Sequence, residues 1–225
     1  MDHSIVIKSL SHSFGEKEVL SQVHLACKTG EVIGILGRNG SGKTTLFEIL
    51  FGALKPDFME IYLDNQLITN KTPLSTFIGY HPQKIMLPKN ILVDDLISIY
   101  IPDGDDQNKI FYAKGINILQ GQRVNSLSHG QQRYLQLLLV LNLKHYFILL
   151  DEPFSMVEPL FRELIIEKIY EYKAQKGFLI TDHYYLDVLE ISDKLNLLSE
   201  SKLIPISTYQ DLISLNYLTE RSLLP

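Results

Sequence analysis

The sequence predicts an α/β protein built on a mainly parallel sheet, and two stretches of the chain carry this prediction. In the second half, apolar runs at residues 146–150 and 177–180 flank an amphipathic stretch, Pro159–Lys173, that has the period of a helix. Near the start, the apolar run Val32–Leu36 leads through a glycine-rich turn into a helical stretch at residues 45–54. Apolar strands that alternate with helices are typical of a parallel sheet covered on both faces.

Shorter strands are expected around these units. Residues 4–8 and 19–26 alternate apolar and polar side chains, which predicts two edge or half-buried strands with a turn at residues 14–17 between them. Short strands are also expected at residues 59–63 and 77–80. Towards the other end, the chain predicts strands at residues 194–198 and 203–206 and one short helix at residues 208–215.

The middle of the chain predicts a small helical subdomain. Pro82, Pro88 and the run at residues 102–106 interrupt regular structure. Residues 84–127 show no strong strand pattern, so short helices and loops are expected there. A long helix follows at residues 131–143, and because it is apolar nearly all round it is expected to be buried.

The composition is that of one packed domain with a subdomain. The chain has 225 residues, of which 45% are hydrophobic and 21% charged, ordinary values for a protein with a core. We therefore divide the single domain 1–225 into a core over residues 1–83 and 144–225 and a helical subdomain over residues 84–143.

The charge and the cysteine content narrow the class of protein. The net charge of −5 argues against a broad nucleic-acid-binding surface, so no nucleic acid partner is expected. The single cysteine, Cys27, is expected to be a small buried residue. The first residues lack a signal-peptide pattern, and no apolar run approaches the roughly 18–20 residues that cross a bilayer. A cytoplasmic protein is expected.

The turn after Val32–Leu36 predicts a phosphate-binding loop. A glycine, four residues and Gly-Lys-Thr between a strand and a helix form the pattern that wraps nucleotide phosphates. The glycines let backbone N–H groups approach the phosphates, and the helix directs its positive end at the same anion. Lys43 adds a cation for the β- and γ-phosphates, and the Thr44 hydroxyl can reach Mg²⁺. The nucleotide-binding residues are Gly37, Arg38, Asn39, Gly40, Ser41, Gly42, Lys43, Thr44 and Thr45.

Polar side chains follow two apolar strands of the predicted sheet. Asp151 can hold Mg²⁺, usually through its waters, and Glu152 can orient or deprotonate an attacking water. A strand end capped by acids is the plainer alternative. His183 follows the strand at residues 177–180. Because ligands bind beyond the carboxyl ends of parallel strands, we expect this imidazole near the phosphate loop.

A second anion site is predicted at the start of the long helix. Residues 127–131 read Leu-Ser-His-Gly-Gln, which puts the Ser128 hydroxyl and backbone N–H groups at a helix N-terminus. An ordinary N-cap explains Ser128 equally well. With one phosphate loop in the chain, the second site has no evident ligand inside the same molecule.

In this order and spacing, the motifs resemble those of the ATP-binding subunits of ABC transporters over nearly the whole chain. The resemblance implies the ABC type of P-loop NTPase fold, with a mainly parallel core sheet, an antiparallel β-subdomain and a small α-helical subdomain. It implies ATP and Mg²⁺ as ligands, and ATP hydrolysis that powers transport. It also implies that two such domains pair head to tail. The matching positions are Phe14, residues 37–44, Gln83, residues 127–131, Asp151 and Glu152, residues 155–158, and His183.

The resemblance implies a role for each matching position. Phe14 would stack on adenine, with a core aromatic as the alternative. Glu152 would be the catalytic base, and His183 would hold the γ-phosphate and the water in line. Gln83 would touch both Mg²⁺ and the attacking water. The metal would be held by Thr44, Gln83 and Asp151, and the partner's nucleotide would be covered by Ser128, Gly130 and Gln131.

Three positions depart from the family pattern. His129 stands where glycine is usual, Glu158 where aspartate is usual, and Leu139 where arginine is common. A side chain at residue 129 would crowd the partner's nucleotide, and the longer acid at residue 158 would slow turnover. Since the catalytic residues are all retained, an active ATPase is expected.

The expected partners follow from the same resemblance. Residues 84–96 resemble the family groove that receives a coupling helix, so the chain would be a peripheral subunit on the cytoplasmic face of the inner or plasma membrane, beside separate permease chains. The second ATPase subunit would be a copy or a paralogue. Residues 128–133 and 181–183 resemble the branch of branched-chain amino acid importers and lipopolysaccharide-export ATPases. A soluble non-transport ABC-type ATPase and a regulatory ATP-binding module stay open as alternatives.

Overall fold

The core of the molecule is a mainly parallel sheet, as predicted. The computed structural model describes residues 2–69 and 72–219, so the remainder of the predicted domain lies outside the described residues. The strands run in the order β11-β10-β4-β9-β8-β7, parallel from β10 to β7, with β11 antiparallel at one edge. Their bounds are β4 (Val32–Leu36), β7 (Ile78–His81), β8 (Phe147–Asp151), β9 (Gly177–Thr181), β10 (Lys194–Ser199) and β11 (Lys202–Ile206).

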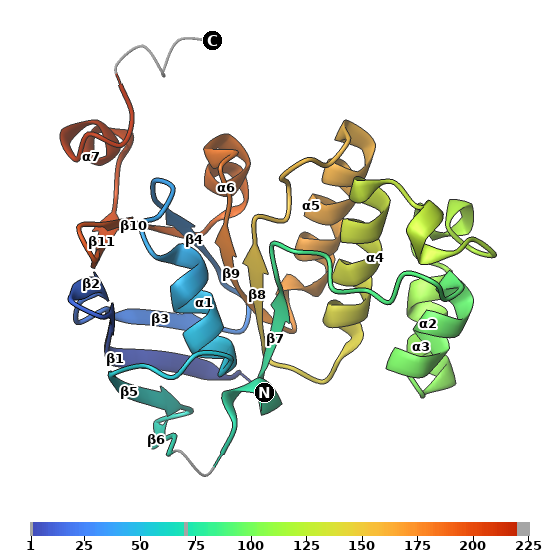
Figure 1. Ribbon diagram of the computed structural model, residues 1–225, viewed down its shortest axis with the longest axis horizontal. Coiled ribbons are helices and arrows are strands. Elements are labelled where there is room, and N and C mark those ends of the chain that lie inside the picture. Colours follow the sequence, from blue (N-terminus) through green and yellow to red (C-terminus); the bar gives the residue numbers. More distant parts are fainter. Residues whose placement is uncertain (1, 70–71, 220–225) are drawn as a thin grey trace.

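A second, antiparallel sheet lies beside the core sheet (Figure 1). It is formed by β1 (Ser4–Phe14), β2 (Lys17–Leu20), β3 (Leu25–Lys28), β5 (Phe58–Leu63) and β6 (Gln66–Leu67). The single strand predicted over residues 19–26 is wrong. The chain turns between β2 and β3 because Gln22 takes a left-handed φ of 47° and Val23 bonds the backbone of Leu10 instead.

The helices cover the core sheet and extend to one side of it. Figure 1 shows α2 and α3 at the end of the molecule remote from β1, β3 and β5, with α4 and α5 between them and the core sheet. The α-helices are α1 (Lys43–Phe51), α2 (Val93–Tyr100), α3 (Gly104–Phe111), α4 (His129–Asn142), α5 (Pro159–Lys173), α6 (Tyr185–Ile191) and α7 (Tyr209–Ser214). Short 3₁₀ turns are η1 (Leu74–Thr76), η2 (Ile116–Ile118) and η3 (Val124–Ser126).

Several helices differ from the prediction, among them α4, which begins two residues earlier than expected and ends one residue earlier. Helix α1 begins and ends earlier than expected, since Gly42 and Gly52 bound it with φ values of 107° and 86° that side chains rarely adopt. The helix α6 was not predicted. It packs on β4 where Gly34 has no side chain: a Cβ there would lie 2.7 Å from Val188.

The strands of the core sheet supply two hydrophobic cores. On β8, Ile148 and Leu150 pack with residues of α4, α5 and α6, whereas Phe147 and Leu149 pack with residues of α1 and β1. Successive side chains of a strand point to opposite faces. An apolar run with no alternation therefore results from a strand that is buried on both faces. Cys27 lies in the second of these cores with a free thiol, as predicted.

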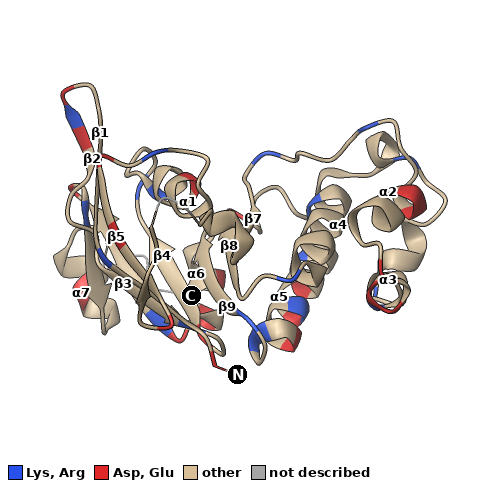
Figure 2. Ribbon diagram, turned by 90° about the horizontal axis from the view of Figure 1, so that it is seen from below, with Lys and Arg blue, Asp and Glu red and all other residues tan. Residues whose placement is uncertain are grey.

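Charged side chains are spread over the molecule. Figure 2 shows Lys and Arg interspersed with Asp and Glu on both the sheet-rich and the helical parts. Within the described residues, no helix combines the length and the apolar character that crossing a membrane requires.

Candidate functional site

A cleft of about 410 Å³ lies beyond the carboxyl ends of β4, β8 and β9. Pockets that bind small molecules have volumes of roughly 300–1,000 Å³. The structure brings most of the predicted site residues together here, and it adds Lys17 and Val19, which sequence reasoning missed. The cleft is lined by Phe14, Lys17, Val19, Asn39, Gly40, Ser41, Gly42, Lys43, Thr44, Thr45, Gln83, Glu152 and His183.

The phosphate loop holds its lysine inside the cleft. The Lys43 Nζ donates hydrogen bonds to the carbonyls of Gly37 at 2.7 Å and Arg38 at 3.2 Å, and the side chain is buried. Burial lowers the pKa of Lys43, while the nearby carboxylates of Glu152 and Asp151 favour its charge. The ammonium therefore lies between the loop backbone and the acids. Gly37 and Arg38 themselves do not line the cleft.

Three of the predicted catalytic residues meet at Glu152. Its carboxylate accepts a hydrogen bond from Gln83 Nε2 at 2.7 Å and pairs with His183 Nε2 at 2.6 Å. The Ser155 hydroxyl donates to the same carboxylate at 3.2 Å. Glu152 also has a left-handed φ of 52°, which is uncommon for a residue with a side chain. The carboxylate is therefore buried, oriented by three neighbours and delivered by an unusual backbone conformation.

Asp151 is fully buried directly before Glu152. Its Oδ1 accepts a hydrogen bond from the Thr181 hydroxyl at 2.8 Å, and its Oδ2 accepts one from the Tyr80 hydroxyl at 3.1 Å. The two donors belong to β9 and β7, the strands on either side of β8. Sequence reasoning assigned no role to either hydroxyl.

The oxygen donors near the cleft are the kind that Mg²⁺ prefers. The Thr44 hydroxyl and the Gln83 amide line the cleft, and the carboxylate of Asp151 is buried directly before Glu152, outside the cleft lining. Mg²⁺ is commonly held by one or two carboxylates, waters and substrate phosphates, not by a complete protein cage. Within residues 2–69 and 72–219, no group of three or more His, Cys, Asp and Glu side chains is placed to hold a metal ion.

Arg133 joins the elements that carry the catalytic residues. Its Nη1 donates to the carbonyls of Pro82 and Gln83, each at 2.7 Å, and its Nη2 donates to those of Asp151, at 2.9 Å, and Glu152. Arg133 is 1% exposed, and burial lowers the pKa of its guanidinium to about 10. One side chain of α4 thus fixes the backbone after β7 and after β8. Arg133 is the one Lys, Arg, Asp or Glu residue of α4, and this isolated charge was the signal that could have identified it.

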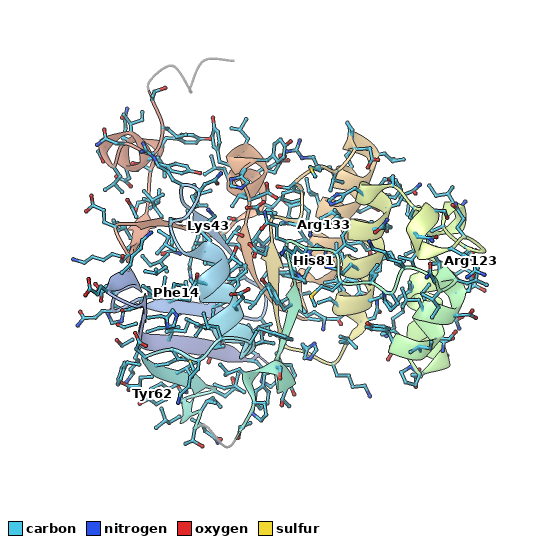
Figure 3. The ribbon with its side chains drawn as sticks, in the orientation of Figure 1. Phe14, Lys43, Tyr62, His81, Arg123 and Arg133 are labelled. Atoms are coloured by element: carbon cyan, nitrogen blue, oxygen red, sulfur yellow. The ribbon has the colours of Figure 1, made fainter. Side chains whose placement is uncertain are left out.

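His81 reinforces the same junction. Burial lowers the pKa of His81 to about 3, so the ring is neutral. Its Nε2 lies 3.1 Å from the Arg133 carbonyl, an acceptor, so this nitrogen carries the proton. Figure 3 shows His81 and Arg133 close together between the core sheet and the helices, with Lys43 on the α1 side.

The residues of the predicted second anion site do not line the cleft. Ser128 is the N-cap of α4: its hydroxyl accepts from Gln131 N at 3.2 Å, and Gln131 Oε1 accepts from Ser128 N at 2.8 Å. A Cβ at Gly130 would lie 1.9 Å from Glu158 Oε2, so only glycine leaves room for that carboxylate. The start of α4 therefore contacts the loop after β8.

Asp182 ties the loop after β8 to the loop that carries His183. Its buried carboxylate accepts hydrogen bonds from Phe154 N at 2.8 Å and from Tyr184 N at 2.9 Å. Burial raises the pKa of Asp182. The loops that hold Ser155 and His183 around Glu152 are thereby bound to each other.

Comparison with known proteins agrees with this geometry. A lipopolysaccharide export system ATP-binding protein, LptB, of Acidithiobacillus ferridurans is 28% identical over 95% of this chain and 93% of its own length. LptB of Escherichia coli K12 is 29% identical over 93% of this chain and 92% of its own length. A probable sulfate/thiosulfate import ATP-binding protein, CysA, of Chlorella vulgaris is 29% identical over 93% of each chain.

Solved structures show the same fold. A nucleotide-free ATP-binding cassette from an ABC transporter superposes with a TM-score of 0.81 at 24% identity, covering 97% of this chain and 96% of that one. An ATP-bound bacterial Atm1-family ABC exporter gives a TM-score of 0.82 at 18% identity, covering 99% of this chain and 42% of that one. The family model described as ABC transporter matches residues 20–155. The chain therefore belongs to the ABC transporter family, as one of its ATP-binding, ATP-hydrolysing subunits.

Proposed function

We propose that the chain binds ATP with Mg²⁺ in the 410 Å³ cleft and hydrolyses it as one half of a head-to-tail pair. The proposal depends on one observation: Gln83 and His183 both contact the carboxylate of Glu152, in the cleft that also contains Lys43. Phosphoryl transfer depends mainly on positioning and charge neutralisation. This arrangement supports both.

Each residue then has a defined task. Glu152 accepts the proton of the attacking water. His183 and Gln83 together orient the Glu152 carboxylate and this water. Lys43 neutralises charge on the transferred phosphoryl group. Phe14, which is 54% exposed and lines the cleft, stacks on adenine. Bound Mg²⁺, held by Thr44, Gln83 and Asp151, would further neutralise the phosphate oxygens.

The second half of each site belongs to the partner subunit. Ser128, Gly130 and Gln131 lie outside the cleft of their own chain, at the start of α4, where backbone N–H groups attract an anion. In a head-to-tail pair this helix start covers the γ-phosphate bound by the other subunit. We further propose that residues 84–143 act as a subdomain that carries it.

A mixing experiment tests this arrangement. Lys43→Ala disables the phosphate loop, and Ser128→Arg blocks the start of α4, so each variant alone should lack ATP turnover. A mixed pair contains one site with an intact Lys43 and an intact Ser128 of the other copy. Steady-state phosphate release should therefore return when the two purified variants are mixed. If the mixture stays as inactive as its components although sizing shows mixed dimers, the head-to-tail pairing is wrong.

We propose that an apolar groove of about 250 Å³ receives a coupling segment of the permease. Its lining includes Tyr80, Met86, Tyr100 and Leu139, and Leu139 makes the wall apolar where the family often has arginine. Exposed apolar patches of this kind mark interaction sites. The chain would thus lie on the cytoplasmic face of the inner or plasma membrane. The similarity to LptB supports a permease of the lipopolysaccharide-export kind.

A charge placed in the groove tests this docking site. Met86 is 73% exposed in the groove, so Met86→Glu is expected to abolish co-purification with detergent-solubilised membrane subunits encoded beside this chain. Tyr112→Glu, which alters a residue 85% exposed outside the groove, is the matched control. ATP binding by each variant checks that it is folded. Retained co-purification of Met86→Glu would exclude the groove, and a soluble client in its place would support a non-transport ATPase.

A further inference from the structure

Tyr80, on β7, contacts Asp151 and is also one of the residues that line the apolar groove. The ring packs against two phenylalanines of α1, with centroid distances of 5.4 Å to Phe51 and 6.4 Å to Phe47. Its hydroxyl donates a hydrogen bond to Asp151 Oδ2 at 3.1 Å. One side chain therefore joins the helix of the phosphate loop, the groove and the acid.

The hydrogen bonds to Asp151 fix the plane of its carboxylate. Thr181 donates to one oxygen at 2.8 Å and Tyr80 to the other at 3.1 Å, from the two strands that flank β8. Both donors are neutral hydroxyls, so neither brings a positive charge to the carboxylate. Each carboxylate oxygen accepts about two hydrogen bonds, so one acceptor position per oxygen stays available for a metal-bound water. Partners of this kind orient metal ligands and tune their affinity.

We propose that Tyr80 is a positioning residue for Mg²⁺, acting through Asp151, and that its ring makes this position responsive to what fills the groove. The inference rests on the proposed function, since it assumes that Asp151 holds Mg²⁺ during ATP hydrolysis. The ring of Tyr80 then contacts whatever fills the groove, and its hydroxyl contacts the acid of the metal site. A segment that packs against the ring would hold the hydroxyl on the acid that it orients.

Tyr80→Phe tests the hydroxyl alone, because it keeps the ring, its packing on α1 and the groove wall. Binding of a fluorescent ATP analogue is titrated with Mg²⁺, and with EDTA in its place. The Mg²⁺ concentration that gives half-maximal enhancement of binding should rise about tenfold, whereas binding in EDTA should not change. Mn²⁺ binding, followed by the loss of the free-ion EPR signal in the presence of the analogue, should weaken to the same extent.

Two further variants separate a role at the metal from a general structural role. Tyr172→Phe removes a hydroxyl that lies outside the cleft and donates to Asn142 Oδ1 at 2.9 Å. This variant should leave the Mg²⁺ titration unchanged. Adding Tyr80→Phe to Asp151→Asn should cause no further weakening of Mn²⁺ binding, because Tyr80 acts through that carboxylate. If Tyr80→Phe does not fold, Thr181→Val carries the test, since it removes the other hydroxyl on Asp151 and should raise the same Mg²⁺ requirement.

The outcomes are distinct. A Tyr80→Phe titration within twofold of the wild type, in a variant with an unchanged thermal melting curve, would overturn the inference and leave the proposed function intact. An equal loss of binding in EDTA and in Mg²⁺ would overturn it too, because it would show a structural effect. If ATP binding by the wild-type protein does not depend on Mg²⁺, the proposed function itself is wrong.

The response to the groove is tested in the assembled complex. Membrane subunits that stimulate wild-type ATP turnover should also lower its half-saturating Mg²⁺ concentration, and Tyr80→Phe should abolish that shift although the complex still assembles. A shift of the same size in the variant would show that occupation of the groove does not act through Tyr80.

Discussion

Replacing Glu152 by glutamine is expected to lower the rate of ATP turnover by about 100-fold or more, the lower end of the contribution of a general base. The amide is nearly the same size, but it cannot accept the proton of the attacking water. It also replaces one carboxylate oxygen by an NH₂ group, which weakens the contacts that Glu152 makes with His183 and Gln83. Lys43 and the phosphate loop are unaltered, so ATP should still bind. The variant should consequently accumulate as an ATP-bound pair.

The measurement combines steady-state phosphate release with size-exclusion chromatography in Mg²⁺ and ATP. Glu167→Gln is the matched control, because Glu167 pairs with Lys114 on the surface, and it should turn over like the wild type. Turnover by Glu152→Gln at the rate of this control would mean that another group is the base. A purely monomeric elution of the variant with ATP bound would count against the paired arrangement.

Replacing Arg133 by lysine is expected to lower the free energy of unfolding by roughly 2–3 kcal/mol, the loss from leaving buried acceptors unpaired. Lysine keeps the positive charge but lacks the planar fork that reaches four carbonyls on two strand ends. Turnover should fall as well. The backbone positions of Gln83 and Glu152 both depend on this guanidinium.

Urea denaturation followed by circular dichroism measures the change in stability. Arg123→Lys is the matched control: Arg123 donates to the carbonyl of Asn90 at an exposed position, so its loss should alter stability by less than about 0.5 kcal/mol. If both variants unfold at the same urea concentration as the wild type, Arg133 does not hold the two strand ends together. If Arg133→Lys unfolds earlier yet turns over normally, the junction stabilises the fold without positioning the catalytic residues.

Much of the fold was predictable because local signals agreed with tertiary burial. The strand Val32–Leu36 and the helix Pro159–Lys173 have the predicted bounds. The strand is apolar at every position, and the helix begins with proline at its first position, where a missing N–H is harmless. The convergence of Glu152 and His183 followed from their places after strands, which the parallel sheet brings to one edge, whereas Gln83 was assigned from the resemblance to the family.

The errors and omissions depend on contacts between distant segments. The turn at Gln22 is set by the backbone pairing of Val23 with Leu10, which no alternation of side chains reveals. The contact of Tyr80 with Asp151 depends on the register of two parallel strands and on which way the ring turns. Arg133 was visible as the isolated charge of a helix that is apolar in its later turns, but its four acceptors come from segments about 18 and 50 residues away, and only folding brings them together.

The backbone conformation at position 152 lowers the stability of the fold while it places a catalytic carboxylate. A residue with a side chain held at positive φ costs of order 1–3 kcal/mol, and glycine would relieve that strain. A buried carboxylate adds a desolvation penalty. Selection for thermodynamic stability alone would thus favour replacement of this acid. An engineered variant whose higher melting temperature comes from a substitution at residue 152 is therefore expected to lose ATPase activity.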